Sequence, residues 1–226
     1  KKLSLPLVDD FSSLDEKFLS GIGVTNTYVF HPLKYLYGLL SQINHPVYEQ
    51  TRVIKLEKHH GEYMCFTNQG HHIYAKEVVV ACHYPFFLIP YFLPIRTSIE
   101  KSYLSAFPVL ENKKYTYITM ESPSLSTRFY DNQGEIYQIF LSESHLTSLK
   151  QNDKEHFENL SKSISNEPIL WSNVDVLTFD HMPIIGPIKK NLYLATGFHT
   201  WGMIESIVSA KMIAQNILGE VSAYQS

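Results

Sequence analysis

The residue types best suited to chemistry gather near the C-terminus, in two short motifs joined by an apolar run. Asp180-His181-Met182-Pro183 has the composition of a turn, and Thr196–Gly202 combines glycines with aromatic residues and a histidine. Glycines at 197 and 202 would let the backbone come close to a flat or anionic group. The helix predicted over 204–219 would point its first N–H groups at the same place. The spacing therefore predicts a binding loop next to a helix N-terminus.

His199 is the candidate catalytic residue of this loop. It lies between Phe198 and Trp201, and an imidazole can gain or lose a proton near neutral pH. The alternative is a structural or exposed loop histidine. Proton transfer at His199 is therefore a hypothesis that depends on where its ring nitrogens point.

The other histidines and the cysteines form no metal or nucleophile pattern. His59-His60 and His71-His72 are neighbours in a strand and turn context, where adjacent side chains point to opposite faces, so each pair offers at most one ligand per side. Cys82-His83 invites a thiolate–imidazole pair, but adjacent residues rarely meet in that way. A buried cysteine that ends a strand is the plainer interpretation, and no metal site is predicted.

The composition is that of an ordinary globular protein. The chain has 226 residues, of which 44% are hydrophobic and 18% are charged, and its formal net charge is −3. This charge gives no electrostatic reason to expect nucleic-acid binding. Cys65 and Cys82 form no close pair, which argues against a disulfide framework and predicts a reducing, cytoplasmic location. The longest apolar run, Tyr84–Ile95, is interrupted by prolines, so no membrane span is expected.

Changes in pattern divide the chain into segments. We expect residues 1–29 to form a polar opening segment, and the strand pattern of residues 30–95 predicts part of a nucleotide-binding α/β domain. His31-Pro32 opens a helix with an apolar stripe, and Val78–Ala81 has the pattern of a strand buried on both faces. Further strands are predicted at Val47–Leu56, Glu62–Thr67 and His72–Lys76.

Residues 96–165 have the alternation and turn residues of an antiparallel sheet. Its predicted strands are Arg96–Phe107, Tyr115–Met120, Leu125–Tyr130 and Glu135–Glu143, and a polar helix over 152–165 would cover one face. Residues 166–226 would return to the first domain and end in the C-terminal helix. The predicted fold class is therefore α/β (α+β), with a partial Rossmann-like domain and a second, antiparallel β-sheet domain.

The order and spacing of these motifs resemble the FAD-dependent D-amino-acid-oxidase/glycine-oxidase superfamily. In that family Asp-x-x-Pro-x-x-Gly and Thr-Gly-Phe-x-x-x-Gly lie against the isoalloxazine, and they occur here as Asp180–Gly186 and Thr196–Gly202. Glu49–Leu56 resembles the family's Thr-x-Val strand, and Glu77–Phe86 resembles its strand near the adenosine. The first domain would then be part of an FAD-binding domain, and the antiparallel sheet would be the substrate domain.

Two sequence variants point to a subgroup of that superfamily. Phe30–Tyr35 and Ala81–Phe86 resemble most closely a bacterial group that is similar to glycine oxidase. Members of this group often carry an added C-terminal Rieske iron–sulfur domain. A Rieske domain or another electron-transfer partner is therefore implied by the resemblance.

The resemblance implies an FAD enzyme that oxidises an amine or amino-acid-like small molecule by hydride transfer to the flavin. Val53 and Ala81 would line the adenosine end. The residues implied at the flavin end are Gly186, Gly197, Phe198, His199, Thr200, Trp201, Gly202 and Met203. Backbone N–H groups of this loop would stabilise negative charge on the reduced ring. The alternative is a non-catalytic interaction or assembly domain on the same scaffold that binds no flavin.

The family's Gly-x-Gly-x-x-Gly motif has no good match. Gly21-Ile22-Gly23 is the candidate, but it lacks the third glycine, an apolar strand before it and an acidic residue about twenty positions on, so a loop is expected. The chain is therefore expected to lack the N-terminal dinucleotide-binding segment. We expect this chain alone to be inactive and to bind FAD weakly or not at all.

The residue that binds the substrate carboxylate in this family also differs here. Amino-acid-oxidising members carry Arg-Pro five residues before the Asp of Asp-x-x-Pro, and this arginine pairs with the substrate carboxylate. The aligned residues here are Asp175-Val176. A carboxylate at this position would repel an amino-acid carboxylate and favour an amine or cationic substrate. Arg128 and Arg96 are the alternative residues that would hold a substrate carboxylate.

Overall fold

The fold is that of a computed structural model, which describes residues 7–8, 21–85, 92–113, 115–120, 124–148, 152–162, 164, 167–222 and 224. The chain forms two compact units, Lys1–Glu49 and Gln50–Ser226. Residues 86–91, which belong to the predicted apolar run Tyr84–Ile95, lie outside the described residues. No helix within the described ranges is long and apolar enough to cross a bilayer.

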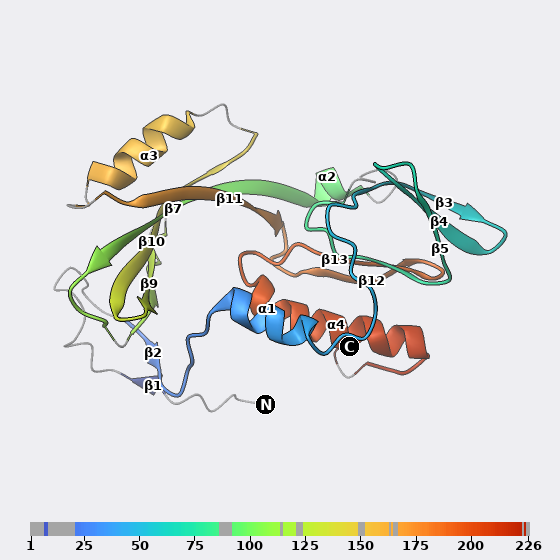
Figure 1. The fold of residues 1–226 in the computed structure, drawn as a ribbon, viewed down its shortest axis with the longest axis horizontal. Helices are drawn as coiled ribbons and strands as arrows, with labels where there is room; N and C mark the ends of the chain where they lie inside the picture. The colour runs from blue at the N-terminus through green and yellow to red at the C-terminus, as the bar shows by residue number, and fades with distance from the viewer. Residues whose placement is uncertain are drawn as a thin grey trace. The chain divides into compact units, whose positions relative to one another are not determined.

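The first unit contains a short two-stranded sheet and a helix (Figure 1). Its elements are β1 (Leu7–Val8), β2 (Gly23–Val24) and α1 (Pro32–Leu40). Gly23 pairs with β1, so the glycine segment expected as a loop ends in a short strand. The helix begins at Pro32 as predicted, because a missing N–H is harmless in the first turn. The Nδ1 atom of His31 caps it by accepting a hydrogen bond from the Lys34 N–H.

The second unit begins with a three-stranded antiparallel sheet. Its strands, in order, are β3 (Val53–His59), β4 (Glu62–Thr67) and β5 (His72–Ala75). The sequence predicts a strand from Val47, but β3 begins at Val53 because its partner β4 ends at Thr67, opposite Val53. The Arg52 N–H instead donates to the Asn68 side chain at 3.0 Å. Buried and half-buried residues alternate along β4, as a strand with one covered face requires.

A three-stranded mixed sheet and a long helix carry the C-terminal motifs. The elements are β6 (Val78–Val80), β12 (Ile184–Lys189), β13 (Leu192–Thr196) and α4 (Gly202–Leu218). The central strand β13 runs parallel to β6 and antiparallel to β12, and all its residues are buried. The prediction that β6 is buried on both faces is wrong. Val79 is 46% exposed, because only the face with Val80 packs into the core.

Two apolar clusters hold this sheet in place. The first cluster joins the sheet of β3–β5, the mixed sheet and α2 (Leu93–Arg96). Its buried residues are Tyr63, Val80, Leu93, Leu192 and Leu194. The Tyr63 hydroxyl also donates to the Lys190 carbonyl at 2.9 Å. The second cluster, Tyr193, Ala195 and Ile213, packs α4 against β13. These contacts fix the C-terminal edge of β13, from which the candidate loop begins.

The predicted antiparallel sheet is present and has five strands. They are β7 (Thr97–Val109), β8 (Tyr117–Ile118), β9 (Ser126–Asn132), β10 (Glu135–Leu146) and β11 (Ile169–Thr178). The strand order is β11-β7-β10-β9-β8. The sequence assigns residues 166–226 to the first domain, yet β11 pairs with β7 along its whole length and therefore belongs to this sheet. The remaining domain boundaries stay predictions.

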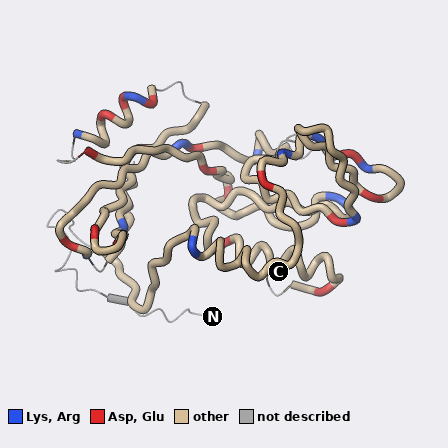
Figure 2. Tube along the Cα trace, viewed as in Figure 1, with Lys and Arg blue, Asp and Glu red and all other residues tan. Residues whose placement is uncertain are grey.

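The helix α3 (Asp153–Lys162) covers one face of this sheet (Figure 1) and carries charges of both signs (Figure 2). The Tyr103 hydroxyl and the Lys101 ammonium both donate to the Asp153 carboxylate at 2.6 Å. His156 Nδ1 lies 2.8 Å from Glu143 Oε2. Hydrogen bonds from Lys101 and Tyr103 hold the pKa of Asp153 below its usual value, although partial burial opposes them. The helix is thus held to the sheet by charge-assisted hydrogen bonds.

Candidate functional site

The two glycines of the C-terminal loop differ in backbone conformation and in the space around them. Gly197 has a φ of +77°, and a Cβ at this position would lie 2.6 Å from Thr178 Cγ2. Gly202 begins α4 without a positive φ, and a Cβ there would meet only Phe198 atoms at 3.7 Å. The fold itself therefore requires a glycine at 197. At 202 the packing of the chain does not require one.

The loop between these glycines has an uncommon backbone. His199 and Thr200 have φ values of 46° and 69°, in the left-handed region that residues with a Cβ seldom adopt. The Trp201 N–H donates to the Phe198 carbonyl at 2.7 Å and closes the turn. Residues held in this conformation often belong to ligand-binding sites, where the surrounding structure supports the strain.

His199 connects this loop to the end of β11. Its ring atom Nε2 lies 2.6 Å from the Thr178 backbone nitrogen and 2.7 Å from the Thr178 hydroxyl oxygen. The His199 N–H donates to the Val176 carbonyl at 3.4 Å. The Thr178 hydroxyl also donates to the Met182 carbonyl at 2.9 Å, so one threonine contacts both C-terminal motifs. Thr178 belongs to neither motif, and no pattern in the sequence predicts its contact with the loop.

The turn of the first motif is stabilised locally. The Met182 N–H donates to Asp180 Oδ1 at 3.1 Å, and this bond lowers the pKa of Asp180 more than the Thr178 hydroxyl or the Arg96 charge does. Gly186 lies in β12 with a φ of +126°, a conformation that other residues rarely adopt. The charge of Arg96 acts on Asp180, so Arg96 lies near this turn.

The N-terminus of α4 can receive a ligand that accepts hydrogen bonds. Trp201 is the N-cap residue and makes no side-chain cap hydrogen bond. The first N–H groups of a helix lack partners within the helix and favour anions and carbonyl oxygens. Glu205, in the first turn, has a buried Oε2 atom with no hydrogen-bond partner among the described residues. A ring edge with both acceptors and donors, such as the pyrimidine edge of a flavin, fits this combination.

Ala81 lies at the same edge as the loop, whereas Val53 does not share its sheet. Ala81 follows β6, which runs parallel to β13, so both strands end on one side of the sheet. The Thr196 hydroxyl donates to the His83 carbonyl and ties these two strand ends together. Ligands of α/β sheets bind beyond such carboxyl ends. Val53 begins β3 in the neighbouring antiparallel sheet.

The candidate substrate residues Asp175 and Arg128 lie far apart. Asp175 is opposite Glu100, and Arg128 is opposite Ile139, with β7 and β10 between their strands. Neighbouring strands are about 4.8 Å apart, so the two residues are separated by about 14 Å across the sheet alone. One small substrate cannot contact both. The Nε atom of Arg128 is buried and has no partner among the described residues.

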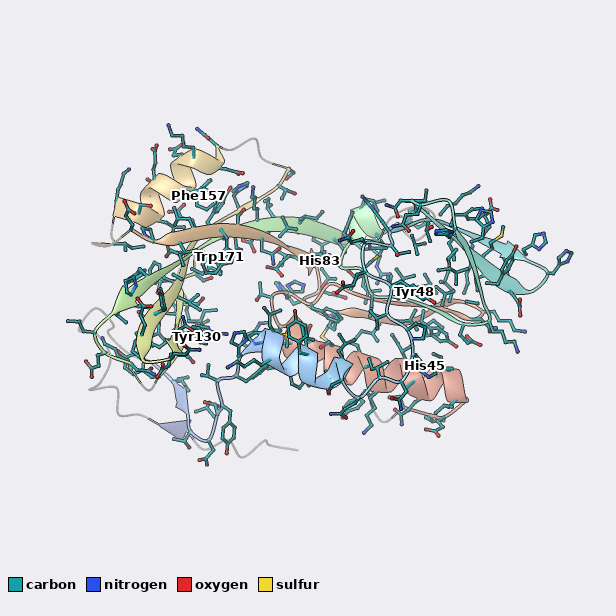
Figure 3. The ribbon with its side chains drawn as sticks, in the orientation of Figure 1. His45, Tyr48, His83, Tyr130, Phe157 and Trp171 are labelled. Carbon is teal, nitrogen blue, oxygen red and sulfur yellow. The ribbon has the colours of Figure 1, made fainter. Side chains whose placement is uncertain are left out.

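Asp175 is the candidate that lies next to the loop. The following residue, Val176, accepts the hydrogen bond from the His199 N–H. Burial raises the pKa of Asp175, the Glu100 charge raises it further, and His83 opposes the shift. Figure 3 labels His83 beside the carboxyl-terminal part of β11. The carboxylate is therefore half-buried and poorly solvated, which favours a cationic partner.

The sheet face away from α3 offers an apolar lining. Trp171 and Leu104 form a cross-strand pair next to Tyr103, so they point away from the helix that Tyr103 contacts (Figure 3). A hollow lined by Lys154, Phe157, Glu158, Ser161, Lys162 and Leu170 lies on the α3 side instead. No candidate site residue lines that hollow.

A family model described as FAD dependent oxidoreductase (DAO) matches residues 5–216. The chain belongs to this family. It is 30% identical over 211 residues to a protein of Bacillus subtilis (strain 168) named as a Rieske 2Fe-2S iron-sulfur protein, YhfW. That match covers 87% of this chain and 41% of YhfW. The predicted superfamily is thus confirmed at the level of the family.

Solved structures share the fold of this chain. Glycine oxidase from Bacillus cereus ATCC 14579 is 17% identical, with a TM-score of 0.59 over 79% of this chain and 52% of that chain. L-proline dehydrogenase from P. horikoshii is 20% identical, with a TM-score of 0.57 over 78% and 52% of the two chains. The predicted fold class is confirmed. The chain spans about half the length, or less, of the proteins it matches.

Proposed function

We propose that the full-length protein containing this chain oxidises an amine or amino-acid-like small molecule with FAD as the hydride acceptor. The observation that carries the proposal is the loop from Gly197 to Gly202. It holds two residues in left-handed conformation, opens α4 without a side-chain cap and leaves the backbone at Gly202 accessible. The family match supports FAD as the cofactor of the whole protein.

The loop residues would hold the flavin mainly through their backbone. The N–H groups at the start of α4 would donate to the carbonyl edge of the ring and stabilise negative charge on it. Phe198, Thr200, Trp201 and Met203 would surround that edge, while Gly186 would lie against the ring from β12 and Ala81 near the adenosine. When bound, FAD accepts the hydride that the substrate loses. Val53 would contact the adenine end through its backbone.

Asp175 would select the substrate. Its half-buried carboxylate lies next to the loop, and Glu100 opposite it adds a second negative charge. An ammonium group would be attracted to this pair, whereas a substrate carboxylate would be repelled. Arg128 lies too far along the sheet to compensate at this position. An amine or a cationic molecule is therefore the proposed substrate class.

The experiment uses the full-length protein and a panel of amines and amino acids. We expect the visible absorbance of a bound flavin, turnover of amines, and poor turnover of glycine, sarcosine and D-alanine. Asp175→Arg should raise the affinity for an amino-acid ligand. Gly202→Val should remove the flavin absorbance, because a branched side chain would occupy the approach to the helix N-terminus.

The results of these experiments distinguish the proposed function from its alternatives. Efficient turnover of glycine or D-alanine by the unmodified enzyme would show that another residue holds the carboxylate. Full flavin content in Gly202→Val would contradict the placement of the flavin at this loop. Absence of flavin from the full-length protein would support the alternative of a non-catalytic interaction or assembly domain.

We also propose a location and an electron-transfer partner. Cys65 and Cys82 are both free, which supports a reducing compartment such as the cytoplasm. The name of YhfW supports a Rieske domain or a separate electron-transfer protein as the partner that accepts electrons from the flavin. Reoxidation of the reduced full-length enzyme, with and without a Rieske protein, would test this proposal.

A further inference from the structure

We propose that His199 is a positioning residue whose ring is neutral, carries its proton on Nδ1 and locks the candidate flavin loop to the end of β11 through Nε2. The role of the ring in this proposal is structural, so it differs from proton transfer to or from a substrate. The loop that the ring locks has a function only through the flavin site proposed above, but the hydrogen-bond pattern does not depend on that site.

The backbone of Thr178 determines which nitrogen is protonated. A peptide N–H can only donate, and the Thr178 nitrogen lies 2.6 Å from His199 Nε2. Nε2 must therefore present its lone pair, and the ring proton must reside on Nδ1. The Thr178 hydroxyl has one hydrogen, for which the Met182 carbonyl, the Asp180 carboxylate and Nε2 compete as acceptors. None of these choices leaves the ring proton on Nε2.

The same few residues of β11 hold the rest of the loop. The Val176 carbonyl accepts the His199 N–H at 3.4 Å, and Thr178 Cγ2 occupies the space that a Cβ on Gly197 would need. His199 is thus bound to β11 through both its backbone and its ring. This explains how two successive residues with a Cβ, His199 and Thr200, remain in the left-handed region.

A proton on Nε2 would break this lock, because it would face the Thr178 N–H and remove its acceptor. The charged and titratable groups around the ring lie on three elements. The His181 ring lies 5.0 Å away on the turn that also carries Asp180, while Arg96 ends α2 and Asp175 lies on β11. Asp180 and Arg96 would act on such a proton with opposite signs.

The occupied lone pair also excludes the role of a base. A general base needs a lone pair within hydrogen-bond reach of the proton that it abstracts. In His199 the one ring lone pair is directed at Thr178, inside the protein. The ring can donate from Nδ1, but it cannot accept a proton from a substrate without breaking the lock.

The test is an NMR experiment on the unmodified, isotope-labelled 226-residue chain. A scalar coupling across the hydrogen bond between the Thr178 amide nitrogen and His199 Nε2 is expected at neutral pH, together with a protonated Nδ1. A protonated Nε2 or a charged ring at neutral pH would overturn the proposal, whatever the flavin content of the full-length protein.

Variants of the full-length protein separate positioning from catalysis. The side-chain oxygen of Gln can accept the Thr178 N–H, so His199→Gln should retain flavin and keep kcat within about tenfold of the parent value, whereas His199→Leu should lose both. His59→Gln, at an exposed position at the end of β3, is the control and should change neither. If His199→Gln and His199→Leu lose turnover equally while both keep flavin, His199 is catalytic and the proposal is wrong.

Discussion

At the scale of the residue, the candidate site depends on a few residues whose positions are fixed by close contacts. Gly197 faces Thr178 Cγ2, and Thr178 also contacts the Met182 carbonyl and the His199 ring. Asp175 has a carboxylate whose surroundings disfavour its charge. Gly202 differs from these residues, because the fold has room for a Cβ at position 202.

Gly197→Ala should destabilise the chain by about 1–3 kcal/mol, because the new Cβ meets Thr178 Cγ2 and the backbone has a positive φ. Gly202→Ala is the control and should be neutral or stabilising by up to about 1 kcal/mol, since alanine favours a helix. The free energy of unfolding in urea measures both. Equal losses of stability in the two variants would contradict the assignment of Gly197 as the glycine that the fold requires.

Asp175→Asn should make the chain more stable at neutral pH. The raised pKa of Asp175 means that the folded state holds the proton more tightly than the unfolded state does. The carboxylate therefore opposes folding once the pH rises above the usual aspartate range and up through the raised folded-state pKa. Below that range both states are protonated and the penalty is absent.

Chemical unfolding across a pH series measures this effect. The stability difference between Asp175→Asn and the parent should grow as the pH rises from acid and then level off. Glu111→Gln, at an exposed position in the same unit, is the control and should show no such trend. A loss of stability in Asp175→Asn at neutral pH would indicate that the carboxylate has a favourable partner.

At the scale of the element, the helix α3 shows how charge can attach a polar segment to a sheet. Its mean hydropathy is low, and Leu160 is its buried residue. Asp153 receives hydrogen bonds from Lys101 and Tyr103, and Tyr103 is fully buried. The attachment therefore combines these hydrogen bonds with apolar contacts of Leu160 and Phe157.

Asp153→Asn should weaken this attachment at neutral pH. The lowered pKa of Asp153 shows that its ionised form is favoured in the fold, so its contribution is present above the usual aspartate range and is lost as the pH falls through the folded-state pKa. The control is Glu155→Gln, which removes a charge from the same first turn of the helix. Hydrogen exchange of the α3 amides should increase in Asp153→Asn only, and the two variants should converge in acid.

At the scale of the whole molecule, the chain matches only part of the proteins that it resembles. It spans 41% of YhfW and 52% of the glycine oxidase whose fold it shares. The described residues include the loop and the helix N-terminus that we propose as the site of the flavin ring. They supply no match to the glycine-rich motif that would hold the pyrophosphate.

The isolated 226-residue chain should therefore bind FAD weakly or not at all and should be inactive. Titration with FAD, followed by the flavin fluorescence, measures the affinity, and the full-length protein is the positive control. A yellow protein with stoichiometric FAD from the chain alone would contradict this prediction. It would also mean that the pyrophosphate is held by residues without a glycine-rich motif.

The sequence alone determined the local features and the family. The proline-opened helix α1, the alternation in β4, the antiparallel sheet and the glycine loop could all be predicted, because short-range sterics and periodicity control them. The order of the motifs was specific enough to indicate an FAD-dependent oxidoreductase, as the family match confirms.

The tertiary structure decided which residues meet. β11 joins the antiparallel sheet because β7 offers it a partner along its full length, and this pairing places Asp175 opposite Glu100. Thr178 and His199 come together across 21 positions only because β11 ends beside the turn that follows β13. No local pattern encodes such a contact, since it depends on strand register and on packing between distant segments.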